Sequence, residues 1–153
     1  MLFSCKISSA VLTYLESKNE DLSQILDSTS LPEEFLCDSS YWMEAADMEN
    51  FLATAEKIYS LQENLFQKVG HAGPGLRSWG VLDSVLKMMP RPQEILSQPE
   101  RFLSYFVSPA PPIDHLVRGE TSIEFDLPIS SEQYPKVTEY LRSAFESLPM
   151  YVG

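Results

Sequence analysis

The feature that most restricts how this chain can fold is a glycine-rich stretch, VGHAGPGLRSWG, which runs from Val69 to Gly80. It holds four of the six glycines of the chain and lies between two segments with strong helical periodicity. Glycine and proline are poor residues for the interior of a helix. We therefore predict that a long helix ends near position 68 and that a second helix begins near position 77. The glycines between them form the predicted hinge, namely Gly70, Gly73 and Gly75.

The segments on either side of the hinge carry apolar residues at helical spacing. In residues 47–68 and the position after them, the predicted buried face is formed by Met48, Phe51, Leu52, Ala55, Ile58, Tyr59, Leu65, Phe66 and Val69. The opposite face, which we expect in solvent, carries Glu49, Glu56, Lys57, Glu63 and Lys68. In residues 77–89 the apolar side consists of Trp79, Leu82, Val85, Leu86 and Met89, and Pro90 and Pro92 end the helix.

Shorter elements precede and follow this pair. Apolar residues and capping signals predict short helices near residues 11–15, 22–26, 31–36 and 41–43, and another that begins at Pro99. Alternating patterns in residues 113–117 and 121–127 predict an antiparallel hairpin with one solvent face. A final helix buries Val137, Leu141, Ala144, Phe145 and Leu148. The predicted fold is α+β, with a mostly helical first two-thirds, then a small antiparallel β-sheet and a C-terminal helix.

Length and charge limit the classes of function. A chain of 153 residues is the size of one domain, so we expect residues 1–153 to form a single one. The net charge of −11 argues against nucleic acid and against an anionic membrane, since both attract basic surfaces. Residues 1–76 hold 12 acidic residues and four lysines, so a partner should be neutral or basic or meet an apolar patch. Cys5 and Cys37 are too few for a disulfide scaffold and indicate a cytoplasmic protein with reduced thiols.

Three phosphate-binding or catalytic motifs were compared with the glycine-rich stretch. Gly70 and Gly75 have the spacing of a P-loop, but Leu76 and Arg77 replace the lysine and hydroxyl that bind phosphate and magnesium. In a dinucleotide-binding loop, Ser78 would stand where the third glycine is needed. A nucleophile elbow needs one residue fewer before its serine. With no paired catalytic carboxylates either, we expect the domain itself not to be an enzyme.

The remaining site candidates are one histidine, one arginine and three aromatic residues. His71 either interacts with the negative end of a helix or acts as an axial haem ligand. No metal site is expected, because the other possible ligands are not at paired spacing. Arg77 either binds an anion at the start of the next helix or pairs with Asp83 or Glu44. The candidates for lining a ligand pocket, each with core packing as its alternative, are Tyr41, Trp42 and Trp79.

Four blocks of sequence resemble a known group of domains. They are Leu31–Glu44, Leu76–Met89, Arg101–Pro109 and Tyr140–Pro149. Together they resemble the N-terminal input domains of bacterial cytoplasmic signalling proteins, particularly sensor histidine kinases. Those domains are distantly similar to the haem–nitric-oxide-binding and vinyl-reductase-type sensor folds. The Tyr-x-Ser-x-Arg motif that holds haem propionates in the haem–nitric-oxide domains is absent here, so the resemblance does not assign His71 as a haem ligand.

The resemblance implies a sensor or regulatory domain from a longer signalling protein of the two-component, histidine-kinase type. Such a module binds a small, apolar ligand or a protein partner and passes the signal through its last helix to a downstream signalling domain, as a homodimer. We expect no cofactor. Two other hypotheses remain open, which are a protein-interaction or dimerisation module without a ligand and a haem-based gas sensor.

Overall fold

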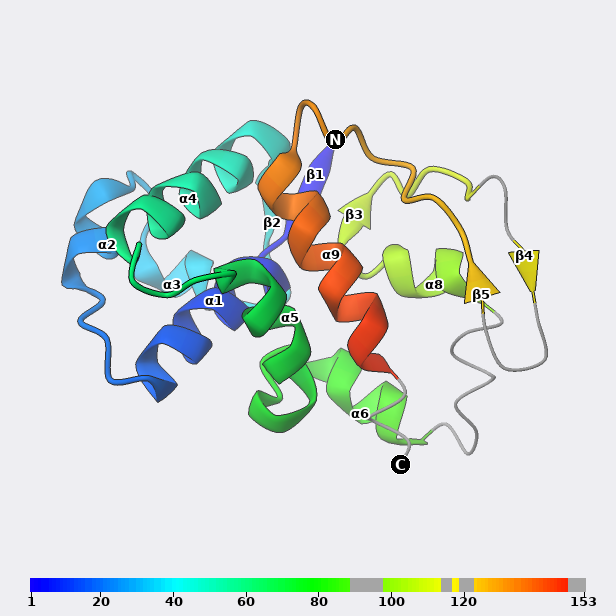
Figure 1. The fold of residues 1–153 in the computed structure, drawn as a ribbon, viewed down its shortest axis with the longest axis horizontal. Helices are drawn as coiled ribbons and strands as arrows, with labels where there is room; N and C mark the ends of the chain where they lie inside the picture. Colours follow the sequence, from blue (N-terminus) through cyan, green and yellow to red (C-terminus); the bar gives the residue numbers. More distant parts are fainter. Residues whose placement is uncertain (89–97, 114–116, 119–122, 149–153) are drawn as a thin grey trace.

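The computed structural model describes residues 1–88, 98–113, 117–118 and 123–148 (Figure 1). The predicted helix end at Met89 with its two prolines, and parts of both predicted hairpin segments, lie outside the described residues. The described residues form helices around a small antiparallel sheet, with a long helix α9 (Pro135–Ser147) near the C-terminal end. The predicted α+β class is therefore confirmed.

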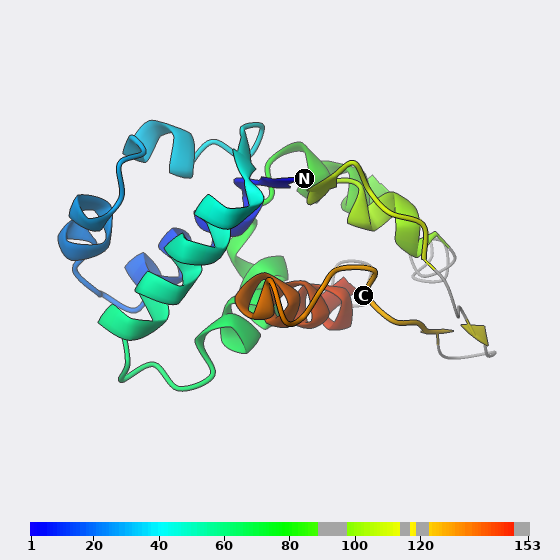
Figure 2. The same ribbon diagram turned by 90° about the horizontal axis from the view of Figure 1, so that it is seen from above.

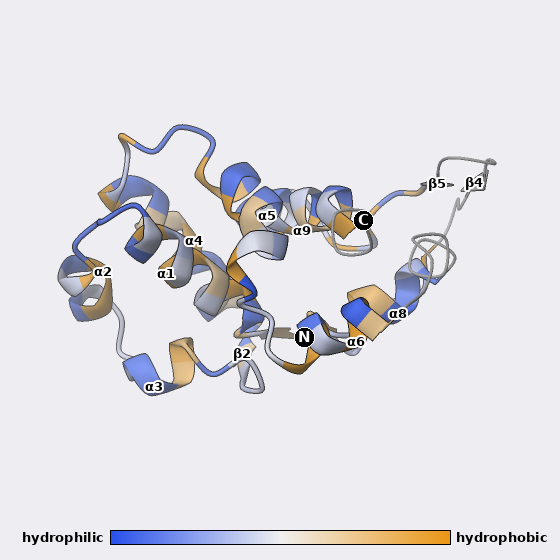
Figure 3. Ribbon diagram, turned by 90° about the horizontal axis from the view of Figure 1, so that it is seen from below, coloured by the Kyte–Doolittle hydropathy of each residue, from blue (hydrophilic) through white to orange (hydrophobic). Residues whose placement is uncertain are grey.

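Four helices form the N-terminal part of the molecule. They are α1 (Lys6–Ser17), α2 (Ser23–Ser28), α3 (Glu33–Leu36) and α4 (Ala45–Ile58). The apolar residues that predicted the first two helices are buried in the core at Val11, Leu15 and Ile25. Figure 3 shows hydrophobic and hydrophilic residues on different sides of α1 and α4, as expected for helices that cover a core.

The main sheet has three short antiparallel strands in the order β2-β1-β3. The central strand β1 (Leu2–Ser4) pairs with β2 (Trp42–Glu44) on one side and with β3 (Val107–Ser108) on the other. The prediction of a helix over residues 41–43 is wrong, and β1 was missed. A strand of two or three residues is too short to show a period of two, and pairing over distant segments decides its conformation.

The predicted hairpin is present as a separate two-stranded sheet. Strand β4 (Val117–Arg118) pairs antiparallel with β5 (Ile123–Glu124). Residue 113 and residues 125–127 of the predicted segments lie outside these strands, and residues 114–116 and 119–122 lie outside the described residues. Between β3 and β4, the Ser108–Pro109 peptide bond is cis.

The predicted end of the helix at Gly70 to Gly75 is wrong, and the chain breaks instead at residues 77–80 of the glycine-rich stretch. Helix α4 ends at Ile58, and α5 (Leu65–Leu76) contains Gly70, Gly73, Pro74 and Gly75. The next helix, α6 (Val81–Met88), begins four residues later than predicted. Although the helix breaks at residues 59–64 instead, the apolar stripe assigned to it is buried apart from Ile58, which is partly buried.

Two of the glycines in α5 are explained by the neighbours of their backbone. A Cβ atom at Gly70 would lie 2.5 Å from Ser143 Cβ of α9, and one at Gly73 would lie 3.1 Å from the Trp79 ring. Nothing lies within 4 Å of the corresponding position at Gly75. Helix packing therefore overrides the low helix propensity of this segment.

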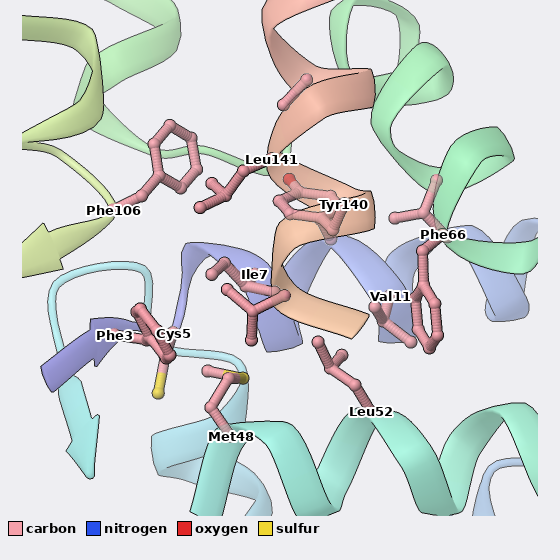
Figure 4. Close-up of a cluster of buried hydrophobic side chains, with 14 of the residues drawn as sticks. Phe3, Cys5, Ile7, Val11, Met48, Leu52, Phe66, Phe106, Tyr140 and Leu141 are labelled. Atoms are coloured by element: carbon pink, nitrogen blue, oxygen red, sulfur yellow. The ribbon is translucent and has the colours of Figure 1, made fainter. Parts of the chain in front are cut away.

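Helix α9 lies against α5 and also contacts α4. Seen from above (Figure 2), it runs between the N-terminal helices and the segment that carries α8 (Pro99–Leu103). Figure 4 shows how the core joins these parts, with Phe3 of β1, Val11 of α1, Leu52 of α4 and Phe66 of α5 around Tyr140 and Leu141 of α9. All six side chains are buried.

Candidate functional site

Helices α5 and α9 pack closely against each other. The absence of a side chain at Gly70 lets the α5 backbone approach Ser143 and the backbone nitrogen of Ala144. The Ser143 hydroxyl donates a hydrogen bond to the Gln67 carbonyl oxygen over 2.5 Å. This carbonyl lies in the first turn of α5, so the two helices are joined by both packing and a hydrogen bond.

The N-terminal end of α9 is held by α4. The Glu49 carboxylate accepts hydrogen bonds from the backbone N–H of Lys136, at 2.8 and 3.1 Å, and of Val137, at 3.1 Å. Lys136 Nζ also lies 2.7 Å from a carboxylate oxygen of Glu56. The prediction that Glu49 faces solvent is wrong, because its carboxylate supplies the acceptor that the free N–H groups of a helix start need. Burial raises the pKa of Glu49, and the N–H donors oppose that rise.

A buried aromatic cluster holds the middle of α9. Trp79 has no exposed surface, and its indole Nε1–H donates to the hydroxyl oxygen of Tyr140 over 2.8 Å. The Trp79 ring contacts Phe102 and Phe106 edge-on, and Phe102 contacts Phe145 of α9 in the same way. Burial raises the pKa of the Tyr140 phenol well above its ordinary range, so it stays protonated and can donate as well as accept.

His71 and Arg77 occupy other positions than predicted. His71 lies in the middle of α5, not at a helix end, and its Nε2 is 2.8 Å from a carboxylate oxygen of Glu146 of α9. Arg77 does not begin a helix. It ends α5 in the left-handed backbone region, with φ of 52°. Asp83, one of its two predicted partners, accepts the backbone N–H of Trp79 at 2.9 Å.

The other two aromatic candidates lie near the sheet. Trp42 begins β2 opposite Ser4 of β1, and it is partly buried. Tyr41 is also partly buried and stacks on Phe35 of α3, with ring centroids 4.6 Å apart. The five candidate ligand-binding residues therefore lie in different surroundings: a solvent-facing contact with a carboxylate, a helix end, the core, and the neighbourhood of α3 and β2.

Sequence reasoning missed a polar junction where the segment before β2 lies against the start of α1. Lys6 Nζ donates to the Ser39 carbonyl oxygen at 2.8 Å, and the Ser8 hydroxyl donates to that of Leu36 at 2.7 Å. The Cys5 backbone N–H donates to the Tyr41 carbonyl oxygen. Burial lowers the pKa of Lys6 and raises that of the Cys5 thiol. The only sign of this polar junction in the sequence is that Lys6 lies beside an apolar run.

Two depressions lined by described residues adjoin α4. A polar depression of about 170 Å³ lies between the residues after α2 and helix α4, lined by Ser28, Thr29, Ser30, Leu31, Asp47, Asn50, Phe51 and Thr54. Another of about 330 Å³ adjoins the turn between α4 and α5. Within the described ranges, no three His, Cys, Asp or Glu side chains are grouped to hold a metal ion.

Comparisons with known proteins identified no relative of this chain. No protein-family model, curated protein or solved structure matches the chain. Among the helices within the described residues, none has both the length and the apolar character required to cross a bilayer. The arrangement of contacts around α9 is therefore the basis for a functional proposal.

Proposed function

We propose that the chain is a non-catalytic sensor or regulatory input domain of a bacterial signal-transduction protein of the histidine-kinase type. It acts in the cytoplasm and responds to a small, apolar ligand or a protein partner. The response is a displacement of α9, passed to a downstream signalling domain in a homodimer. The resemblance of four sequence blocks to such input domains supports this class.

One structural observation carries the proposal, which is that contacts from distant parts of the chain converge on α9. Glu49 of α4 binds its first turn, Gly70 of α5 packs against its middle, and Trp79 bonds to Tyr140. Phe102 of α8 contacts Phe145 near its end. A change at any of these elements alters the surroundings of α9, and packed interfaces of this kind shift between discrete arrangements.

The test uses the tryptophan next to α9 as its reporter. In Trp42→Phe, Trp79 is the only tryptophan, and its N–H bond to Tyr140 makes its emission sensitive to movement of α9. We would screen small apolar metabolites and basic proteins for changes in this emission. Amide hydrogen exchange of residues 135–147 is then measured with each compound or protein that binds.

The proposal expects an effector that changes both Trp79 emission and exchange in α9. Binding that leaves α9 exchange unchanged across all effectors found would overturn it. Adding haemin is a separate test. A Soret band that appears with the wild-type protein and is lost in His71→Ala would favour the haem-sensor hypothesis. Haem ligation by His71 would require its contact with Glu146 to break.

A protein-interaction module without a small ligand is the second candidate function. The observation that favours it is the filling of the space beside α9 by Trp79, Phe102, Phe106 and Tyr140, all of which are buried. This candidate expects the reporter to respond to a protein partner or to self-association and to no small molecule. Sedimentation velocity of the wild-type protein measures the self-association.

A further inference from the structure

An aromatic pair on the surface of the N-terminal part is partly exposed to solvent. Phe35 of α3 stacks on Tyr41 with an angle of 7° between the rings, yet 39% of Phe35 remains exposed. Figure 3 shows α3 at the periphery of the molecule, near β2. An exposed phenylalanine held in a fixed stack presents apolar area without the entropy loss of ordering a mobile side chain.

Carboxylates lie next to this pair in the sequence. Glu33 and Glu34 precede Phe35 directly, and Asp38 follows by three residues; all three are exposed. Residues 31–44 contain four acidic residues and no lysine or arginine. Burial raises the pKa of the Cys37 thiol, and the carboxylates of Glu33 and Glu16 raise it further.

The segment that carries these groups is fixed to the core. The hydrogen bonds of the polar junction hold the carbonyls of Leu36, Ser39 and Tyr41 against α1 and the end of β1. The Asp38 carboxylate accepts hydrogen bonds from the backbone N–H and hydroxyl of Ser40, which lower its pKa and keep it ionised. The surface is therefore preorganised and negatively charged.

We propose that Phe35 and Tyr41, together with the carboxylates of Glu33, Glu34 and Asp38, form a docking surface for an arginine-bearing segment of a partner protein. A guanidinium group can stack on an aromatic ring and pair with a carboxylate at the same time, whereas the ammonium of lysine is a compact point charge that does not stack. The proposal extends the proposed function by naming the class of partner, and its binding test does not depend on movement of α9.

The experiment measures binding of two fluorescein-labelled peptides, hexa-arginine and hexa-lysine, by fluorescence anisotropy at low and physiological salt. The wild-type protein should bind hexa-arginine about two- to fivefold more tightly, which is the fold-change expected from a cation–π contact at an exposed site. Phe35→Ala should remove this preference. The control Leu61→Ala, at a residue that is 95% exposed on the turn after α4, should retain it.

Charge is tested with a matched pair of variants. Glu33→Gln/Glu34→Gln should weaken the binding of both peptides more than Glu63→Gln/Glu132→Gln, which removes two exposed charges elsewhere. Equal binding of the two peptides to the wild-type protein, or an equal effect of the two double variants, would overturn the proposal. In both cases the α9 exchange experiment still tests the proposed function separately.

Discussion

The two ends of α9 are held by different physical means. Its first turn is bound by charged groups, with the Glu49 carboxylate on two backbone N–H groups and Lys136 on Glu56. Its later turns are held by close packing and aromatic rings, through Gly70 against Ser143 and through Trp79, Phe102 and Tyr140.

The packed part of α9 and its polar first turn should therefore differ in how much they stabilise the fold and in how easily they move. Close-packed contacts tolerate no small displacement, because overlap costs energy steeply. Charged and hydrogen-bonded contacts at a partly exposed helix end can exchange with water at a modest net cost. We therefore expect variants in the packed part to change the free energy of unfolding most, and variants in the polar part to change it least.

The largest effect is expected for Gly70→Ala. The new methyl group would overlap Ser143 and lie 2.8 Å from the Ala144 backbone nitrogen, so the helices must separate. We expect a loss of about 1–3 kcal/mol in the free energy of unfolding, measured by urea denaturation. Gly75→Ala is the control, since its Cβ meets open space and the higher helix propensity of alanine should stabilise α5. Equal behaviour of the two variants would contradict the packing argument.

The next effect is expected for Tyr140→Phe. It removes the acceptor of the buried Trp79 indole N–H while preserving the ring. A buried donor left without its acceptor costs about 1–3 kcal/mol, and Trp79 emission should change with it. Tyr105→Phe, at a partly buried residue, serves as the control for loss of a hydroxyl. A Tyr140→Phe protein as stable as the control variant would show that this hydrogen bond is unimportant.

A smaller effect is expected at Glu49. Glu49→Ala removes the acceptor for the first turn of α9 and should cost about 1 kcal/mol, whereas Glu49→Gln keeps an amide oxygen in its place and should cost less. Thermal denaturation of both variants measures the difference. Identical losses for the two would show that the carboxylate does not act as a cap.

The pH dependence of Glu49 has a definite sign. Because burial raises the pKa of Glu49 in the folded state, the folded protein binds this proton more tightly than the unfolded chain. Stability from this group is therefore present at low pH and falls as pH rises from the unfolded value, about 4.3, through the raised value. The wild-type protein should gain stability relative to Glu49→Gln when the pH is lowered across that interval.

The smallest effect is expected for His71→Ala. The contact between His71 and Glu146 joins α5 to α9, but the two side chains are 44% and 55% exposed. Exposed pairs of this kind contribute at most about 1 kcal/mol and are screened by salt. We expect a loss of ~0.5 kcal/mol or less in urea denaturation, compared with Lys68→Ala on the same helix. A loss as large as that of Gly70→Ala would contradict the ranking of close-packed contacts above exposed polar ones.

The sequence predicted burial better than it predicted boundaries. The stripe from Met48 to Val69 is buried although a turn divides it, because the hydrophobic pattern reports which residues face the core. The turn was missed because it contains neither glycine nor proline and ends at Asn64 in the left-handed region. Gly70 was taken for a helix break, since a sequence cannot show that Ser143 will lie against it.

The candidate site was less predictable than the fold. The sequence around Trp79 and Tyr41 fits a core role and a ligand-binding role equally well. Only the neighbours of each residue in the fold show which role it has. The polar junction at Lys6 and Ser39 joins residues 33 positions apart in the sequence, so no local pattern reveals it. Glu49 likewise acts on residues 87 and 88 positions away.

The position of α9 also has a consequence for synthesis on the ribosome. The helix on which the other elements converge is translated after all of them, and the Ser143 bond to Gln67 joins residues 76 positions apart. At about 5–20 residues per second, the faces of α4 and α5 stay uncovered for several seconds while the intervening chain emerges. The nascent protein therefore passes through a period in which chaperones can bind the surface that α9 later covers.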